Sequence, residues 1–262
     1  GMIYVRGHAR DFDAWAEMGA DGWAHADVLP YFKRMETYGG GADAFRGGDG
    51  PLHVHRAQPQ DPLTLAFLKA GEDAGYPMTH DLSGQRQEGF GVSDRTVFRG
   101  KRWSTARAYL DPARKRANLE IRTNAQVQHL VFDGTRAIGV AYKDGTGTTV
   151  TARARREVIL SAGAVGSPHI LMLSGIGPAD HLQDMGIEVR HDLPGVGQNL
   201  NDHPDFVLKY DCLKPVSFWP KTKPLAKIAA GLQWFLTRRG IVASNLFEAV
   251  ACVRYGAGVE YP

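Results

Sequence analysis

The stretch Glu157-Val158-Ile159-Leu160-Ser161-Ala162-Gly163 joins a continuous apolar run to a turn of small residues. An apolar run without alternation predicts a strand that is buried on both faces, as strands of parallel sheets are. The following residues, from about Ser167 to Leu173, predict a helix. A strand, a glycine turn and a helix in this order form half of a doubly wound α/β unit, so this stretch decides the fold class.

Three segments upstream of that unit alternate apolar and polar residues with the period of two that is typical of strands. They are marked in turn by Val127 and Val131, by Ile138, Val140 and Tyr142, and by residues 149–154. Asp133-Gly134 and Asp144-Gly145 lie between the segments and are hairpin signals. We therefore predict a three-stranded β-meander.

The remaining chain predicts a mixture of helices and short strands. Asp61 is a candidate N-cap, Pro62 suits the first helical position, and Gly75 lies where that helix must end. By similar signals we predict helices over about residues 25–36, 61–74, 104–115 and 225–238, and strands over 52–55, 206–212 and 247–255. The 31 glycines and 14 prolines imply many turns, which fit an α/β or α+β enzyme better than a helical bundle.

Composition argues against several classes of protein. The 31 basic and 28 acidic side chains give a net charge of +3 without a basic block, which disfavours nucleic-acid binding. Cys212 and Cys252 suggest neither a disulfide framework nor a metal site, and predict two buried, reduced thiols. No apolar stretch approaches the roughly 20 residues of a membrane span. We expect no transmembrane span and a cytoplasmic location, or a peripheral one at the inner membrane.

The turn at Ala162-Gly163 is the first candidate for chemistry. A glycine at the end of a parallel strand lets a phosphate or ribose approach backbone N–H groups. The turn lacks the G-x-G-x-x-G spacing, however, and on pattern alone it favours close strand–helix packing over a ligand site.

Two longer motifs resemble the signatures of one enzyme family. The run from Gly166 to Gly177 closely resembles the second sequence signature of the glucose-methanol-choline (GMC) oxidoreductases, and Gly1 to Gly7 is similar to the end of the first. Further segments agree with that family in the same order, namely residues 11–15, 48–51, 87–91, 104–110 and 193–203. The resemblance covers essentially the whole chain. Residues 87–91, 188–194 and above all Ser244 to Ala249 are most similar to the choline dehydrogenases of the family.

The resemblance implies an α/β fold in two interleaved parts. One is an incomplete FAD-binding, Rossmann-like domain that carries the β-meander, formed by residues 1–10 and 103–205. The other is an incomplete α+β substrate-binding domain, formed by residues 11–102 and 206–262. Both ends of the chain look like cuts in a longer protein, because neither a leader nor a capping element is recognisable.

The resemblance also implies which residues contact the cofactor, FAD. Gly1, Met2 and Ile3 match the segment whose main chain passes the flavin ring and stabilises negative charge there. Val127 matches a valine whose main chain pairs with the adenine edge, although by itself it looks like a core strand residue. Ala162 and Gly163, in the turn before the predicted helix, are then also candidate cofactor-binding residues.

Glu248 is the candidate substrate residue. It resembles the glutamate that choline-oxidising members of the family set against the quaternary ammonium group, which must be held by charge and aromatic faces. The alternative is a structural salt bridge, for example to Arg254. Phe218, Trp219, Trp234 and Phe247 could supply an aromatic wall, but each could equally be a core aromatic.

No residue of the chain matches the family's catalytic base, a histidine paired with a second His or Asn. His203 fits a role in holding a loop, or a position near the cofactor, better than a role as base, so we assign no catalytic residue and no metal ligand. The implied reaction of the parent enzyme is choline oxidation to betaine aldehyde by hydride transfer to flavin N5, with the electron acceptor open. This chain alone is expected to be inactive. Two alternatives are another GMC enzyme for aryl or aliphatic alcohols and a truncated, non-catalytic binding module.

Overall fold

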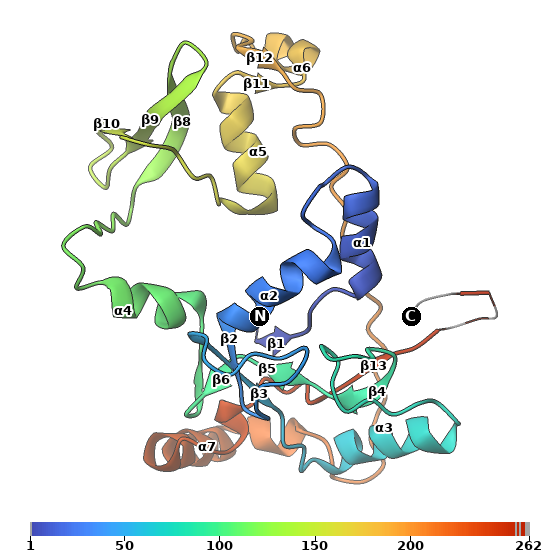
Figure 1. Cartoon of the computed structure of the whole chain (residues 1–262). Coiled ribbons are helices and arrows are strands. Elements are labelled where there is room, and N and C mark those ends of the chain that lie inside the picture. The colour runs from blue at the N-terminus through green and yellow to red at the C-terminus, as the bar shows by residue number, and fades with distance from the viewer. Residues whose placement is uncertain (1, 255, 257, 260–262) are drawn as a thin grey trace. The chain divides into compact units, whose positions relative to one another are not determined.

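The chain is mixed α/β and divides into two compact units (Figure 1). A computed structural model describes residues 2–254, 256 and 258–259. Unit 1 comprises residues 1–119 and 210–262, and unit 2 comprises residues 120–209. The predicted fold class, an α/β fold with part of a Rossmann-like FAD-binding domain, is confirmed.

A four-stranded sheet forms the centre of unit 1. Its strands follow the order β1 (Ile3–Tyr4), β5 (Asp94–Arg95), β3 (Leu52–Arg56) and β2 (Glu36–Tyr38). Arg95 pairs with Ile3 on one side and with His55 on the other, both in antiparallel register. Because residues paired in this way share a face of the sheet, these three side chains belong to one face, and Tyr4, Asp94 and Arg56 to the other.

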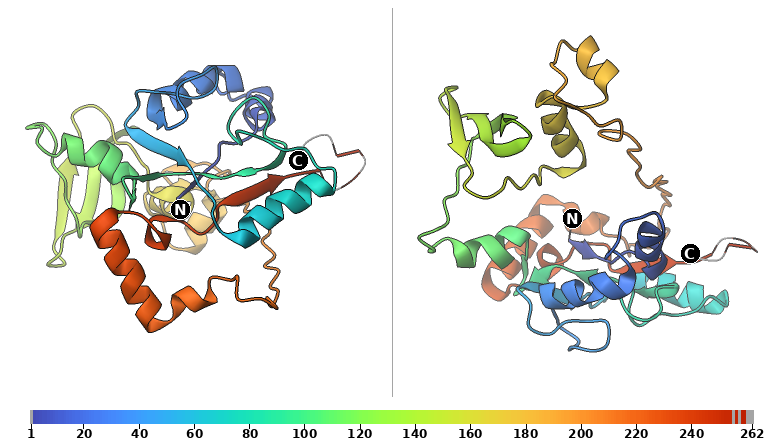
Figure 2. Two further views of the ribbon diagram at one scale, coloured as in Figure 1. Left: turned by 90° about the horizontal axis from the view of Figure 1, so that it is seen from below. Right: turned by 45° about the horizontal axis from the view of Figure 1, so that its top comes forward.

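A second, two-stranded sheet pairs β4 (Gly89–Val92) with β13 (Ala249–Cys252). Helix α3 (Pro62–Asp73) lies against both strands (Figure 2). The helix begins as predicted, since the Asp61 carboxylate accepts the backbone N–H groups of the first turn. Gly71 faces Phe90, and a Cβ at that glycine would lie 2.4 Å from the ring. A small residue is therefore needed where the helix meets the sheet.

The other elements of unit 1 are short helices and a hairpin. Helices α1 (Ala9–Glu17) and α2 (His25–Met35) pack through Phe12 and Phe32, whose ring centroids are 5.5 Å apart. The helix expected from Ser104 is a π-helical turn, η1 (Ala106–Leu110), followed by α4 (Asp111–Ala113). The hairpin β6 (Val97–Phe98) and β7 (Lys101–Arg102), the 3-10 turns η2 (Trp219–Thr222) and η3 (Ile241–Ala243), and helix α7 (Pro224–Thr237) complete the unit.

Unit 2 contains the predicted meander. Its strands are β8 (Gln126–Asp133), β9 (Arg136–Lys143) and β10 (Thr149–Arg153), all antiparallel, with two register shifts between β8 and β9. The glycine with positive φ in the second hairpin is Gly147 rather than Gly145. Helix α5 (Gly163–Leu173) packs on β8, and α6 (Ala179–Asp184) follows it, with the short parallel pair β11 (Ile176–Gly177) and β12 (His191–Asp192).

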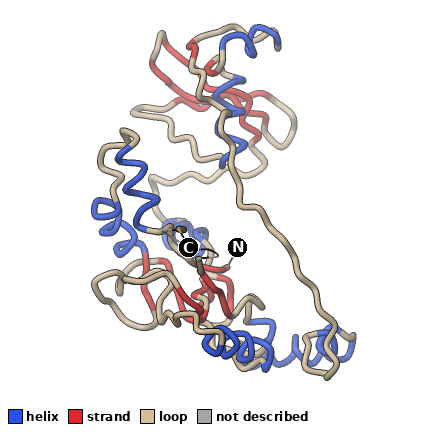
Figure 3. Tube along the Cα trace, turned by 90° about the vertical axis from the view of Figure 1, so that its right-hand side faces the viewer, coloured by secondary structure: helices blue, strands red, loops and turns tan. Residues whose placement is uncertain are grey.

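Two predicted strands are wrong. Residues 157–161 form no strand, and Ile159 is 79 % exposed, because no parallel neighbour pairs with this segment among the described residues. Residues 206–212 lie in a long loop (Figure 3). Cys212 is therefore exposed and not buried as predicted, while Cys252 is half-buried in β13. Of the strand predicted over 247–255, Ala249–Cys252 is formed, and Tyr255 is outside the described residues.

Among the described residues, none of the helices has both the length and the apolar character that crossing a bilayer requires.

Candidate functional site

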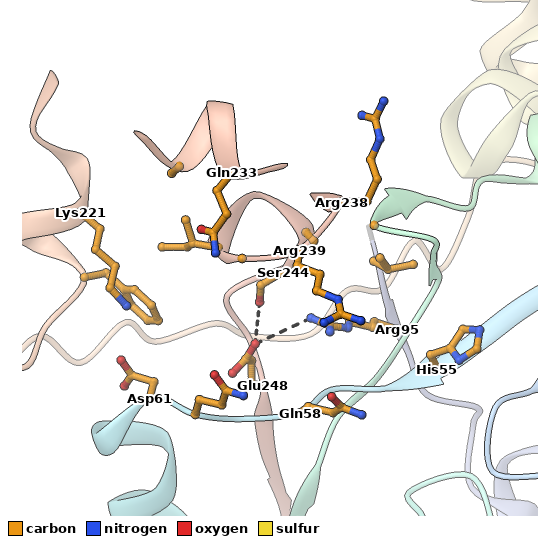
Figure 4. Close-up of a pocket in the computed structure, with 18 of the residues that line it drawn as sticks. His55, Gln58, Asp61, Arg95, Lys221, Gln233, Arg238, Arg239, Ser244 and Glu248 are labelled. Atoms are coloured by element: carbon orange, nitrogen blue, oxygen red, sulfur yellow. Dashed lines mark hydrogen bonds and ion pairs between the residues drawn. The ribbon is translucent and has the colours of Figure 1, made fainter. Parts of the chain in front are cut away.

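A cavity of about 1300 Å³ lies within unit 1, between the β3–β5 face of the central sheet and helix α7 (Figure 4). His55 and Arg95 line it from the strands, and Gln233 lines it from α7. Ser244 and Glu248 come from the segment that joins η3 to β13. The cavity therefore collects polar side chains from parts of the chain that are far apart in sequence.

Glu248 is held in this cavity through one carboxylate oxygen. The Ser244 hydroxyl donates a hydrogen bond of 2.7 Å to Oε1, and Arg95 Nη1 lies 3.7 Å from the same atom. No hydrogen bond to Oε2 is found among the described residues. The backbone fixes this position as well, because the carbonyl of Glu248 accepts the N–H of Ser93 at 3.0 Å. The carboxylate is thus anchored on one side and available on the other.

Arg95 is the cation nearest to Glu248. Its side chain is 16 % exposed, and its Nη1 is buried without a hydrogen-bond partner. Burial lowers the pKa of Arg95, and the nearby carboxylate of Glu248 acts in the opposite direction. The pair is an ion pair without a hydrogen bond, because 3.7 Å exceeds hydrogen-bonding distance.

His55 lies beside Arg95 on the same face of the sheet. Its ring is near-parallel to Phe98 at a centroid distance of 5.5 Å, and His53 stacks on the same phenylalanine at 3.8 Å. Burial lowers the pKa of His55, and the neighbouring His53 and Arg95 lower it further. The histidine is therefore kept neutral in the wall of the cavity.

The predicted aromatic wall is largely missing from this cavity. Of the four candidates, Phe218 lines it. Trp234 instead donates its indole N–H to the carbonyl of Gly100 at 2.6 Å, while Trp219 and Phe247 are mostly exposed.

The suggested salt bridge from Glu248 to Arg254 is wrong. Arg254 is bound to Glu88 at 2.8 Å. The strand register explains this, because Cys252 pairs with Gly89 and Ala249 with Val92. Arg254 therefore falls beside Glu88 at one end of the sheet, while Glu248 lies at the other end.

The proposed flavin-ring segment is fixed by the central sheet. Gly1 is outside the described residues. The carbonyl of Met2 accepts the backbone N–H of Thr96 at 2.8 Å, and Ile3 pairs with Arg95 while remaining 44 % exposed. Ile3 is thus the strand neighbour of the residue that contacts Glu248.

The proposed nucleotide-contacting residues all lie in unit 2. Val127 is a half-buried residue of β8 that pairs with Tyr142. Ala162 precedes α5, and its N–H is bonded to the Ser167 hydroxyl at 3.0 Å. Gly163 has φ +88°, and an added Cβ would meet no atom within 4 Å, so the turn has open space beside the helix start.

His203, which the sequence favoured as a residue that holds a loop or lies near the cofactor, is exposed, and its own backbone N–H bonds to the carboxylate of Asp202. It does not line the cavity that contains Glu248.

Comparison with known proteins settles the family. The profile described as GMC oxidoreductase matches residues 1–205. The chain belongs to the GMC oxidoreductase family. FAD is accordingly its cofactor, as predicted from the two sequence signatures.

Individual members of the family are similar to this chain in sequence and in structure. The chain is 50 % identical over all 262 residues to an oxygen-dependent choline dehydrogenase of Brucella ovis, and 51 % identical to one of Sinorhizobium medicae. It spans about half the length of these relatives, 47 % in each case. An FAD-dependent oxidoreductase from Chaetomium thermophilum has a similar structure, with a TM-score of 0.85 and 28 % identity over 96 % of this chain and 46 % of that one.

Sequence reasoning missed the two side chains that contact Glu248. Ser244 is four residues away in the chain, and its hydroxyl could have been considered as a local partner. Arg95 could not have been found in this way, because it lies 153 positions from Glu248. The two residues are brought close because β13 pairs with β4, which leads through Ser93 into β5.

Proposed function

We propose that the protein of which this chain forms a part oxidises choline to betaine aldehyde in an FAD-dependent reaction. One observation carries the proposal, namely the Glu248 carboxylate in a large cavity, which is anchored through Oε1 and whose Oε2 has no hydrogen bond from any described residue. The 50 % identity over all 262 residues of this chain to part of a choline dehydrogenase supports the same substrate.

The residues present fit the cofactor. Open space at Gly163 leaves room for a ribose or phosphate beside the first N–H groups of α5. Gly1, Met2 and Ile3 would lie beside the flavin ring, and Val127 would contact the adenine edge through its main chain. When bound, FAD accepts the hydride that leaves the alcohol carbon.

We assign the two parts of the family fold to the same ranges as the resemblance implies. Residues 1–10 and 103–205 would form the FAD-binding portion, and residues 11–102 and 206–262 the substrate-binding portion. The match of the family profile to residues 1–205 supports the presence of the first.

Substrate recognition follows from charge. A quaternary ammonium group neither donates nor accepts an ordinary hydrogen bond, so a carboxylate and aromatic faces must hold it. At about 4 Å and an effective dielectric constant of about 20, one ion pair is worth about 4 kcal/mol before desolvation is subtracted. Glu248 would orient choline by binding the trimethylammonium head group, and the hydroxyl end of choline would remain free to react.

We propose that the 262-residue chain alone does not turn over choline. It contains no match to the histidine pair that acts as base in the family, so no group is assigned to remove the hydroxyl proton. With added FAD and an artificial electron acceptor, no choline-dependent reduction of the acceptor is expected. Turnover above the rate without choline would contradict this part of the proposal.

A second candidate is an uncharged alcohol substrate. The observation that favours it is Arg95, which lies within ion-pair distance of Glu248 and offsets part of its charge. Under this alternative, the Arg95–Glu248 ion pair would only stabilise the fold, and the cavity would select its alcohol substrate by shape.

Binding to wild type and to the Glu248→Gln variant separates the two candidates. Choline and 3,3-dimethylbutan-1-ol, its uncharged analogue of the same shape, are titrated by calorimetry. If choline is the substrate, Glu248→Gln should weaken choline binding at least about tenfold, or about 1.4 kcal/mol. The binding of the neutral analogue should change less than about twofold. Equal effects on the two ligands would favour the uncharged alcohol.

A further inference from the structure

The contacts of Glu248 are unevenly shared between its two oxygens. Ser244 and Arg95 both approach Oε1, at 2.7 and 3.7 Å. A cation that enters the cavity would meet Oε2, but the charge of the whole carboxylate would already be partly balanced by Arg95. The strength with which the cavity attracts a cation therefore depends on Arg95 as well as on Glu248.

The backbone of Arg95 is fixed, whereas its side chain is weakly held. Strand β5 lies between β1 and β3, so Arg95 pairs on both sides, with Ile3 and with His55. Its guanidinium, however, makes no hydrogen bond to Glu248, and its Nη1 is buried without a partner. An ion pair with this geometry recovers little of the desolvation cost of two mostly buried charges. A competing cation therefore displaces a weak contact.

Three other basic residues of the cavity have contacts elsewhere. Arg56 bonds to Asp94 at 3.3 Å, Arg238 stacks on Trp234, and Lys221 lies over the ring of Phe218. Arg239 also lines the cavity but makes no ion pair with Glu248 among the described residues. Arg95 is thus the basic side chain that is placed to share Glu248 with a ligand.

We propose that Arg95 is a specificity-determining residue, which competes with the cationic head group of the substrate for Glu248. In this role it sets how strongly the cavity prefers a quaternary ammonium alcohol to a neutral alcohol of the same shape. The inference rests on the proposed function, because it takes Glu248 as the group that binds the cation.

The test is the Arg95→Met variant of the 262-residue chain, which removes the charge and keeps an unbranched side chain. Dissociation constants for choline and 3,3-dimethylbutan-1-ol are measured by calorimetry on folded protein, with circular dichroism as the check of folding. Arg95→Met should bind choline about tenfold more tightly than wild type and change the neutral analogue by less than about twofold. Arg95→Gln gives the same comparison if the methionine variant does not fold.

A matched control removes a positive charge from the same cavity at a residue that does not contact Glu248. Lys221→Met should tighten choline binding by less than about threefold, because its charge lies over Phe218. An equal gain in Arg95→Met and Lys221→Met would overturn the proposal, since the net charge of the cavity would then explain both.

The double variant Arg95→Met/Glu248→Gln tests the link between the two residues. The gain from Arg95→Met should vanish when Glu248 carries no charge, and a gain that persists would overturn the proposal. The proposal for Arg95 would also be overturned if Arg95→Met had the same selectivity for choline over the neutral analogue as wild type, whichever of the two ligands wild type prefers. The proposed substrate fails on a different result, namely an unchanged selectivity in Glu248→Gln.

Discussion

Asp94 and Arg95 are consecutive residues of β5 whose side chains face opposite sides of the sheet, and they illustrate two uses of a buried charge. Asp94 accepts hydrogen bonds from Arg46 at 2.9 Å and from Arg56 at 3.3 Å. Within the described part of the chain, Arg95 has one carboxylate within 4 Å, that of Glu248, and no hydrogen bond to it. On the face of the sheet that carries Asp94, charged side chains bond to one another in a network. The face that carries Arg95 borders the cavity.

The network on the Asp94 side extends to the segment that carries Met2 and Ile3. Arg46, which is fully buried, bonds to Glu36, Asp81 and Asp94 at 2.8 to 3.0 Å. Arg6 reaches Glu36 at 2.5 Å, and Arg46 also stacks on the ring of Tyr38. Glu36 Oε2 and Arg46 Nη2 are buried without a hydrogen-bond partner among the described residues, but every charged side chain of the network is tied to at least one other by a hydrogen bond. Such linked buried charges stabilise one arrangement of the chain. The charges on the Asp94 side therefore fix the fold, whereas the Arg95–Glu248 pair, which has no hydrogen bond between its members, is available to a ligand.

The largest effect on stability is expected from a substitution that breaks the network around Arg46. Arg46→Met leaves Glu36 and Asp94 buried without their main partner, which should lower the free energy of unfolding by about 3–5 kcal/mol. Urea denaturation of the variant and of wild type measures this difference. Lys69→Met is the control, because Lys69 forms exposed ion pairs on α3, worth about 0.5 kcal/mol or less. Similar losses in the two variants would show that the network is not structural.

A smaller effect is expected at the cavity. Ser244→Ala removes the hydrogen bond to Glu248 Oε1 and should lower the free energy of unfolding by about 1 kcal/mol. Ser244→Thr keeps the hydroxyl and should retain most of that stability. In the Glu248→Gln background the effect of Ser244→Ala should shrink, which a double-mutant cycle in urea detects. An undiminished effect there would mean that Ser244 acts through another contact.

The smallest effect is a dependence of stability on pH. Burial, with His53 and Arg95 nearby, holds the pKa of His55 below its ordinary value of 6.5. As pH falls below 6.5, the unfolded chain binds a proton at this residue that the folded chain does not. Stability should therefore be highest above pH 6.5 and fall as pH is lowered toward the folded-state pKa.

His55→Gln should flatten this part of the stability profile, which urea denaturation between about pH 7 and pH 5 records. His203→Gln, at an exposed histidine, serves as the control and should leave the profile as in wild type. If the two variants have the same profile as wild type, the lowered pKa of His55 does not contribute to folding.

Local patterns predicted much of the fold. The helix capped by Asp61, helices α2 and α7, and the meander are all marked by short-range signals, and the structure contains them. The apolar run from Val158 to Leu160 failed as a strand because a parallel strand depends on neighbours from distant segments. The hydrophobic pattern of a segment does not show which other strands it can pair with.

The candidate site shows the same limit. Glu248 was found through its resemblance to a family motif, but its ion pair with Arg95 depends on how β13 pairs with β4 and β5 with β3. Strand register is a property of the folded chain, so a side chain 153 positions away carries no local mark of the contact. For the same reason, Arg254 was suggested as partner although its register places it beside Glu88.

The edge of β8 has a consequence for how this protein associates with itself. The Ser174 hydroxyl accepts the N–H of Leu130 at 2.8 Å, α5 packs on the strand, and a register shift between Val127 and His129 interrupts its regular spacing. A strand from a second molecule cannot readily extend the meander at such an edge. Intermolecular sheet growth is thereby directed to β10, where the exposed charge of Arg153 makes it less favourable. The two edges of the meander are thus protected differently, one by an occupied backbone N–H and a packed helix and the other by a charged side chain.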